Sequence, residues 1–376
     1  MTILRVQNQH LFSQYKARQG ELHEKNGRDS EQLLWHGTSD DCVDKIINNG
    51  FNRSYCGRNV VVIPVVVFFV ILKLAGFISS EPLPPVPIYI KSSAKRVSYS
   101  LMEKRKGSIC PILQGGLGNR LFQFATAFSA ARSKNMNLFI PSDAEIRDVF
   151  EITDTINESK ELCKGFRKVL DRASPTYHKN LMNFSSTDNI QLGYGLQSWK
   201  YFYMYDKQLK KQLTFRKHIQ NEAKQTIDKI LQRWKIKSRR SVNLVGIHIR
   251  RGDKVTSYDD GYKIATPEYL NRSVNYYAKK YSAVLFLVIS DGMSWSRENV
   301  PSHVPVAYIS LGKRELDMAT LVACDHTIMT IGTFGWWIGY LTGGDVVYMK
   351  DAAVKGSRFE KVLNIEDHFF PHWIGL

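Results

Sequence analysis

The feature that most constrains the fold is an apolar run over residues 242–249 that ends abruptly in two arginines, Arg250 and Arg251. An apolar run of this length is typical of a strand that is buried on both faces of a parallel sheet. Open parallel sheets bind their ligands at the carboxyl ends of their strands. Because a buried guanidinium group needs an anion and binds phosphate oxygens in pairs, the two arginines favour a diphosphate site.

The residues around the two arginines extend this predicted site. His248 lies in the strand itself, and Asp253 follows shortly after its end. Since side chains alternate between the faces of a strand, we expect one arginine to face the ligand and the other to face Asp253 or the core. Arg250 and Asp253 are candidate catalytic residues. His248, Arg250 and Arg251 are candidate binding residues. The alternative is a purely structural pair between an arginine and Asp253.

A glycine-rich turn near residue 115 marks a second candidate site. The short apolar run 109–113 leads into this turn, and apolar residues at helical spacing follow it up to the next strand-like run, 138–140. Gly116 and Gly118 would let a ligand approach the backbone at the helix N terminus. Asn119 adds an oriented amide, and we treat it as a third candidate catalytic residue. The alternative is a plain tight turn between a strand and a helix.

The remaining sequence repeats the alternation of strand and helix. Residues 332–335 form a glycine turn that opens a helix, which places Thr333 and Phe334 as candidate binding residues at a helix N terminus. The pattern predicts an α/β fold of the GT-B type, with two Rossmann-like halves, 108–240 and 241–376, facing a cleft. The other elements expected in the second half are strands over 283–292, 327–330 and 345–349, the last strand of the chain, and a helix over 316–323.

Residues 60–78 are 19 residues long and carry one charge. This is close to the roughly 20 residues that a helix needs to cross a bilayer. A proline-rich stretch follows, which is typical of an extended stalk. We therefore expect a transmembrane helix over 60–78, a stalk over 79–107 and a cytosolic segment over 1–58. The alternative is a buried pair of strands in a soluble domain.

The net charge of +17 does not indicate a nucleic-acid partner. Residues 199–240 hold 13 Lys and Arg against 3 Asp and Glu, so much of the excess lies in one expected surface region. No DNA- or RNA-binding motif accompanies this region. A solvated basic face, or attraction to anionic substrates or membrane headgroups, accounts for the charge.

The five cysteines are too few and too widely spaced for a disulfide scaffold or a zinc site, and their pairing cannot be deduced from the sequence. No Asp-x-Asp stands at the end of a predicted strand. We therefore expect no metal and no cofactor, with positive side chains in place of a cation.

Several motifs together resemble one known family. They are similar to motifs of the animal galactoside α-1,2-fucosyltransferases of glycosyltransferase family 11. The motifs are HIRRGD (248–253), SDGMSWSREN (290–299), TIMTIGTFGWWIGYLTGGDVVYM (327–349) and the closing FFPHWIGL. The resemblance covers residues 109–376. It implies GDP-fucose as the donor, bound by the half 241–376, and a β-galactoside-terminated glycan as the acceptor, bound by the half 108–240. It also implies inversion at the transferred sugar. It further implies a single-pass type II protein of the Golgi membrane with a lumenal catalytic domain.

The same resemblance implies roles for individual residues. Arg250 matches an arginine that contacts the β-phosphate of GDP, and Arg251 matches a supporting arginine. Thr333 matches a phosphate-contacting hydroxyl, and Asp317 takes the place of a carboxylate that reads guanine. Asn119 matches the asparagine of a related loop in protein O-fucosyltransferases.

The general base stays open at this point. Related α-1,6 enzymes carry a glutamate eight residues after the first arginine, where this chain has Tyr258. Asp253, Asp259 or Asp260 could serve instead, or the reaction could proceed with little help from a base.

Residues 6–58 resemble a different family, the poly(ADP-ribose) polymerases. LLWHGT carries the NAD-binding histidine of that family, here His36, followed by Gly37. The resemblance stops before the tyrosine and glutamate that such a site requires. We expect this segment to be non-catalytic, and an NAD-dependent ADP-ribosyltransferase is the alternative function. Another fucosyl linkage is the alternative within the first family.

Overall fold

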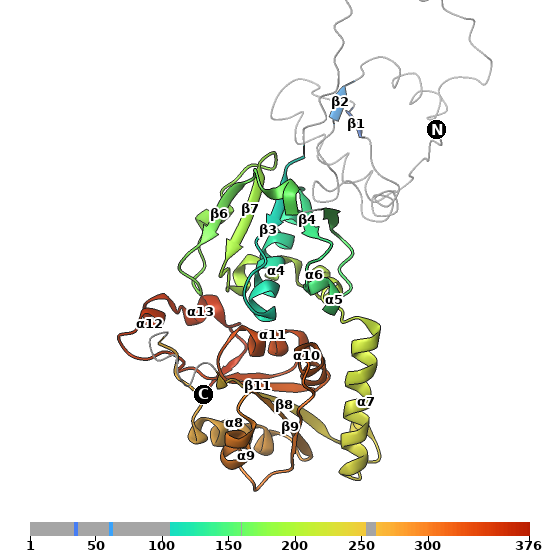
Figure 1. Ribbon diagram of the computed structural model, residues 1–376, viewed down its shortest axis with the longest axis vertical. Helices are drawn as coiled ribbons and strands as arrows, with labels where there is room; N and C mark the ends of the chain where they lie inside the picture. The colour runs from blue at the N-terminus through green and yellow to red at the C-terminus, as the bar shows by residue number, and fades with distance from the viewer. Residues whose placement is uncertain (1–33, 37–59, 63–105, 159, 253–260) are drawn as a thin grey trace, which may run out of the picture. The chain divides into compact units, whose positions relative to one another are not determined.

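A computed structural model of the chain describes residues 34–36, 60–62, 106–158, 160–252 and 261–376 (Figure 1). The chain divides into two compact units, Met1–Val97 and Ser98–Leu376. In the first unit, strand β1 (Leu34–His36), which contains the predicted NAD-type histidine, pairs antiparallel with strand β2 (Val60–Val62).

The predicted membrane helix over 60–78 differs from the structure where the two can be compared. Val60–Val62 form strand β2, so the prediction of a helix is wrong for these three residues. β-branched residues such as valine favour an extended backbone, which explains the difference. Residues 63–78 of the predicted span, and the stalk up to residue 105, lie outside the described residues. Of the helices that the structure describes, none combines the length and apolarity needed to cross a bilayer.

The first sheet of the second unit is fully parallel and has the strand order β5-β4-β3-β7-β6. Its first strand in sequence, β3, lies in the middle, and long helix α4 follows β3 directly. The bounds are β3 (Ser108–Pro111), α4 (Leu117–Lys134), β4 (Asn137–Pro141), α5 (Ile146–Val149), β5 (Ile156–Glu158), β6 (Arg167–Asp171), β7 (Asn189–Tyr194) and α6 (Asp206–Gln212).

The second sheet is also parallel, with the order β10-β9-β8-β11-β12-β13. Strand β8, the apolar run before Arg250, is central and buried along almost its whole length. The bounds are β8 (Asn243–Ile249), α8 (Pro267–Lys280), β9 (Val284–Ser290), α9 (Met293–Asn299), β10 (Val306–Tyr308), α10 (Arg314–Val322), β11 (His326–Met329), α11 (Thr333–Thr342), β12 (Val346–Tyr348), α12 (Arg358–Val362), α13 (Ile365–His368) and β13 (Ile374–Gly375).

Two parallel sheets confirm the predicted α/β class, with a sheet in each half of residues 108–376. In the second sheet the chain moves outward from β8 through β9 to β10, and then returns to the other side of β8 as β11. The loops after β8 and β11 therefore diverge at a topological switch point, where open α/β sheets bind ligands. Arg250 follows β8, and Thr333 follows β11.

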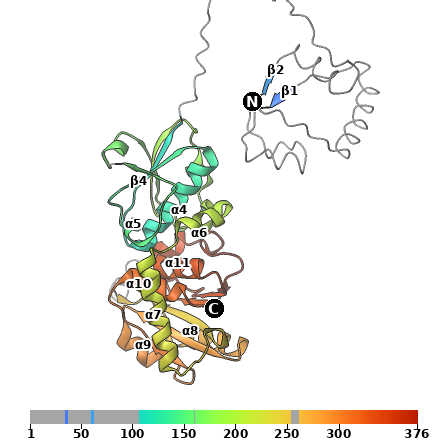
Figure 2. The ribbon, with the colours of Figure 1, turned by 90° about the vertical axis from the view of Figure 1, so that its right-hand side faces the viewer.

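The basic region predicted for the surface includes helix α7 (Lys217–Arg233), which lies over α10 of the second half (Figure 2). Its buried residues recur at a spacing of four and pack against α10. This spacing places one apolar stripe inward, so that its lysines and arginines lie on the solvent side.

Two features were not foreseen from the sequence. The strand expected to be last, 345–349, is β12, and a further strand, β13, pairs with it from the closing segment. A strand of two residues has too little pattern to be recognised in advance. Cys110 and Cys163 form a disulfide within the first half, while Cys324 is a free, buried thiol.

An aromatic cluster holds the two halves together. Phe122 of α4 is fully buried, and its ring centroid lies 4.6 Å from that of Trp336 and 5.1 Å from that of Trp337, both on α11. Phe202 adds a stacked contact to Trp337, with 5.6 Å between ring centroids. These residues belong to one core that includes side chains of both sheets.

The segment with α12 and α13 also crosses from the second half to the first (Figure 1). The Thr176 hydroxyl donates to the carbonyl oxygen of Val362 over 2.7 Å. Asp367 accepts hydrogen bonds from the backbone of Tyr177 over 2.9 Å and from Lys200 Nζ over 2.6 Å. The end of the chain is thereby fixed to both halves, beside the cavity described next.

Candidate active site

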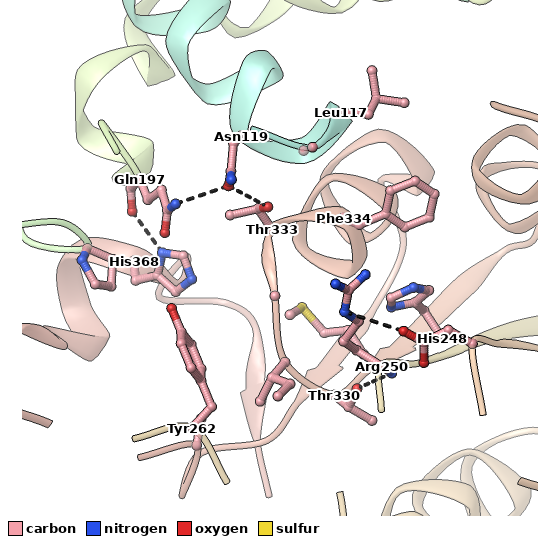
Figure 3. Close-up of a pocket in the computed structure, with 18 of the residues that line it drawn as sticks. Leu117, Asn119, Gln197, His248, Arg250, Tyr262, Thr330, Thr333, Phe334 and His368 are labelled. Carbon is pink, nitrogen blue, oxygen red and sulfur yellow. Dashed lines mark hydrogen bonds and ion pairs between the residues drawn. The ribbon is translucent and has the colours of Figure 1, made fainter. Parts of the chain in front are cut away.

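A cavity of about 630 Å³ lies where the two halves meet (Figure 3). Loops that follow β8, β9 and β11 line one side, and the glycine turn before α4 lines another. Segments near β12 and the C terminus close one end. The cavity therefore sits at the carboxyl end of the second sheet, at its switch point, as expected for a ligand site of an open α/β sheet.

Arg250 is positioned in this cavity by two neighbouring strands. Its backbone N–H donates to the Thr330 hydroxyl over 2.9 Å, which joins the ends of β8 and β11. Its Nε lies 3.4 Å from Asp291 Oδ2, at the end of β9. The guanidinium group is partly exposed to the cavity, and the carboxylate orients it. A positioned guanidinium fork is suited to binding two phosphate oxygens.

Arg251 points elsewhere, as alternation along the strand predicts. Its guanidinium carbon lies 3.8 Å from the centroid of the Trp295 ring, which is a cation–π contact. One of its nitrogens donates to the carbonyl oxygen of Ala265 over 3.4 Å, and its backbone N–H donates to Asp291 Oδ1 over 2.6 Å. Arg251 is not among the residues that line the cavity, so a contact with the ligand is not apparent for it.

His248 lines the cavity beside Arg250 and is almost completely buried. Burial lowers the pKa of its imidazole to about 4, so the ring is neutral at physiological pH. Its Nδ1 has no hydrogen-bond partner within the part of the chain that the structure describes. A Cβ on Gly335 would lie 2.9 Å from that nitrogen, which explains why the helix has a glycine at this position.

The N terminus of α11 opens directly onto the cavity. Gly332 precedes it with φ of 91°, a positive value that only glycine adopts without strain, and this N-cap residue has no side chain to cap the helix. The first N–H groups of α11 are thus available to an anion, and the helix dipole favours negative charge there. This arrangement, next to Arg250, suits a diphosphate.

Asn119 connects the two halves at the cavity. Its Oδ1 accepts hydrogen bonds from the Thr333 hydroxyl over 2.8 Å and from Gln197 Nε2 over 3.2 Å (Figure 3). The predicted phosphate-contacting hydroxyl of Thr333 is therefore directed at Asn119. A Cβ on Gly118 would lie 2.6 Å from the backbone nitrogen of Phe334. Gly118 thus allows α4 and α11 to meet, whereas no described residue beyond its chain neighbours comes within 4 Å of a Cβ placed on Gly116.

Asp317 lies on the α10 side of the cavity. Its Oδ1 is buried and has no hydrogen-bond partner among the described residues. Burial raises the pKa of this carboxyl, although a hydrogen bond from the Leu311 backbone opposes the effect. Arg314, one turn earlier, also lines the cavity and forms an ion pair with Glu145 of the first half, which in turn pairs with Arg120.

Comparison with known proteins gives the family. Residues 86–376 match the model of glycosyl transferase family 11. The chain belongs to this family. Galactoside alpha-(1,2)-fucosyltransferase 2 of Hylobates lar is 29% identical over 326 residues, which cover 82% of this chain and 90% of that protein. The protein of the same name from Gorilla gorilla gorilla is 31% identical over 276 residues, with 70% and 77% covered.

A solved structure, NodZ alpha-1,6-fucosyltransferase soaked with GDP-fucose, is 13% identical and has a TM-score of 0.44, with 65% of this chain and 95% of that chain covered. As a family 11 glycosyl transferase, the chain is an enzyme that transfers a sugar, and the predicted family is confirmed.

In this family 11 enzyme, most of the predicted site residues come together. Four positions considered for the base lie outside the described residues, namely Asp253, Tyr258, Asp259 and Asp260. Arg251 turns away from the cavity. The described residues include no group of three His, Cys, Asp or Glu that could hold a metal ion. The predicted residues that line the cavity are Gly116, Gly118, Asn119, His248, Arg250, Asp317, Thr333 and Phe334.

Sequence reasoning missed several residues of the family 11 site. Asp291 had a signal, because Ser-Asp-Gly follows a predicted strand next to the one that carries Arg250. No sequence signal marked the other residues, because tertiary structure alone brings them to the cavity. They are Gln197, Arg314, Tyr262 and His368.

Proposed function

We propose that this enzyme is a galactoside α-1,2-fucosyltransferase that transfers L-fucose from GDP-fucose to the 2-hydroxyl of a terminal β-galactose with inversion. One observation carries the proposal: the guanidinium group of Arg250, the N terminus of α11 and the carboxylate of Asp317 line a single cavity. Both relatives named above are galactoside α-(1,2)-fucosyltransferases, and their names support fucose as the transferred sugar and a galactoside as the acceptor.

The described residues suit the parts of GDP in order. Guanine presents two adjacent N–H donors, and the carboxylate of Asp317 can accept both. The diphosphate lies between Arg250 and the N terminus of α11. When the bond between C1 of fucose and the β-phosphate oxygen breaks, its electron pair leaves with GDP. Arg250 stabilises the charge that develops on that oxygen, which lowers the barrier.

The acceptor hydroxyl oxygen forms the new bond to C1 on the face opposite to the leaving diphosphate, and its proton passes to a base. Asp253, Asp259 and Asp260 remain the candidates for this base. We propose that the positive charge of Arg250 and the dipole of α11 serve in place of a metal ion.

Turnover of GDP-fucose with a β-galactoside, measured as GDP release and as product, tests this function. The expected result is transfer from GDP-fucose that exceeds transfer from GDP-mannose or UDP-galactose, and that persists with a chelator present. Loss of turnover on chelation would contradict the metal-free mechanism. Equal use of a uridine nucleotide sugar would contradict the role of Asp317.

Replacing Asp317 with asparagine is expected to weaken GDP binding about 10- to 100-fold, because hydrogen bonds to a charged group contribute about 1.5–3 kcal/mol. An amide cannot accept from both N–H donors as a carboxylate does. Glu315→Gln, on the same helix but outside the cavity lining, is the matched control and should bind GDP normally. Calorimetric titration with GDP measures both variants.

The raised pKa of Asp317 predicts a pH dependence of the same equilibrium. A carboxyl with a raised pKa takes up its proton at a higher pH than an ordinary aspartate, and the protonated group no longer accepts both donors. GDP affinity should thus be complete above this pKa and fall as the pH drops through it. Asp317→Asn lacks this carboxyl group, so the pH dependence of its GDP affinity shows the part that is due to protonation of the phosphate. Identical titrations of the two proteins would refute the assignment.

We also propose a single-pass type II protein of the Golgi membrane, with a span within the apolar residues 63–78, a stalk over 79–107 and a non-catalytic cytosolic segment over 1–58. The apolar composition of the span supports this arrangement. In sealed microsomes, added protease should remove the N-terminal segment and leave the catalytic unit protected. Digestion of the catalytic unit in sealed vesicles would exclude this topology.

A further inference from the structure

One end of the cavity is not needed to bind the guanine or the diphosphate of GDP. It is lined by the side chains of Tyr262, Phe359, His368 and Phe369, which we call the aromatic end. The rings of Tyr262 and Phe359 lie 3.9 Å apart between centroids, and those of His368 and Phe369 lie 4.6 Å apart. Aromatic rings can pack against the apolar faces of a sugar, and a polar atom such as an imidazole nitrogen of His368 can bind one of its hydroxyl groups. This combination suits a sugar site.

The imidazole of His368 is held in one orientation and one tautomer. Its Nδ1 lies 2.7 Å from the carbonyl oxygen of Gln197 (Figure 3). A carbonyl oxygen only accepts, so Nδ1 carries the proton and Nε2 presents a lone pair. Nε2 is not among the fully enclosed polar atoms, and the residue lines the cavity. Figure 3 shows the hydroxyl group of Tyr262 pointing toward this ring.

The chemistry of this nitrogen suits hydrogen bonding better than proton transfer. Burial lowers the pKa of the His368 imidazole to about 4, although the hydrogen bond to Gln197 opposes the effect. The ring is therefore neutral at physiological pH and accepts hydrogen bonds throughout that range. A group with so low a pKa is a weak general base near neutrality.

The strand order places the aromatic end with respect to the donor. Asp291 follows β9, and Asp317 lies on α10, which packs against β8 and β9, whereas Arg250 and α11 follow β8 and β11 in the middle of the sheet. The aromatic end belongs to segments next to β12 and the C terminus. With guanine at Asp317 and the diphosphate at Arg250, the sugar end of the nucleotide points toward the aromatic end. Gln197, which holds His368, belongs to the first half, for which we predict acceptor binding.

We propose that His368 determines acceptor specificity by accepting, through Nε2, a hydrogen bond from a non-reacting hydroxyl of the galactoside. The rings of Tyr262 and Phe359 pack against an apolar face of the same sugar. This inference rests on the proposed function and identifies the residues that select its acceptor. It assigns His368 to positioning the acceptor, and the reacting 2-hydroxyl passes its proton elsewhere.

Steady-state kinetics of His368→Phe and His368→Gln test the proposal at saturating GDP-fucose. The phenylalanine variant keeps a planar ring but lacks the acceptor nitrogen, so its KM for the galactoside should rise about 10-fold, as expected when a hydrogen bond is lost and a polar group is left unpaired. Its kcat and its affinity for GDP should change less than about threefold. The glutamine variant can accept through Oε1 and should regain most of the acceptor affinity. GDP affinity confirms that each variant is folded.

Deoxygenated galactosides identify the hydroxyl and do not depend on the folding of a variant. The wild-type enzyme should lose about 10-fold in kcat/KM with one of the 3-, 4- or 6-deoxy acceptors, and His368→Phe should show no further loss with that acceptor. An unchanged acceptor KM in His368→Phe, or a rise in the KM for GDP-fucose instead, overturns the proposal while the transfer function stands. Absence of transfer to any β-galactoside by the wild type overturns both.

Discussion

Replacing Arg250 with alanine is expected to lower kcat/KM for GDP-fucose by about 100- to 1,000-fold, the cost typical of removing one group that stabilises developing charge. The guanidinium group lies at the switch point, oriented by Asp291 and by the backbone hydrogen bond to Thr330. Because the leaving diphosphate gains charge in the transition state, the loss should affect kcat as well as donor binding. Steady-state kinetics with varied GDP-fucose measure both quantities.

Two controls separate the role of Arg250 from a general effect of charge. Arg272→Ala removes an exposed guanidinium group on α8, away from the cavity lining, and should retain normal turnover. Arg250→Lys keeps the charge but loses the planar fork, so it should lie between wild type and Arg250→Ala. Retention of full turnover by Arg250→Ala would show that the diphosphate is bound elsewhere.

Replacing Phe122 with alanine is expected to destabilise the catalytic unit by about 3–5 kcal/mol, the range for removal of a fully buried aromatic side chain. Its ring contacts Trp336 and Trp337 on α11, which also begins at the cavity. The cavity left by the substitution would therefore loosen the packing between the two halves. Chemical denaturation at equilibrium measures the free energy of unfolding.

Met204→Ala is the matched control for Phe122, because this side chain is 71% exposed and its loss should change the free energy of unfolding by less than about 0.5 kcal/mol. A change below about 1 kcal/mol for Phe122→Ala would contradict the role of the aromatic cluster. Because α11 belongs both to the aromatic cluster and to the cavity, the GDP affinity of Phe122→Ala shows whether the cavity keeps its structure.

The sequence predicted those parts of the site that depend on strand ends. Buried strands leave long apolar runs, and the residues just after them must meet at one edge of a parallel sheet. Arg250, Thr333 and the glycine turn before α4 follow from this rule. The opposite orientation of Arg251 follows from alternation along the strand, although the structure gives it Trp295 as a partner.

Other parts of the structure left no local pattern in the sequence. His368 reaches the cavity because the C-terminal segment crosses to the first half, and its partner Gln197 is 171 residues away in sequence. The pairing of Cys110 with Cys163 likewise depends on how the first sheet is assembled. The role of Gly118 was expected to be ligand approach, whereas its missing side chain makes room for the α11 backbone.

The most direct test of the central claim is linkage analysis, by mass spectrometry and NMR, of the product formed from GDP-fucose and a β-galactoside. We expect a single fucose in α-linkage to the 2-position of the terminal galactose, with GDP released in equal amount. Fucose at another position, fucose in β-linkage, or hydrolysis of GDP-fucose without transfer would contradict it.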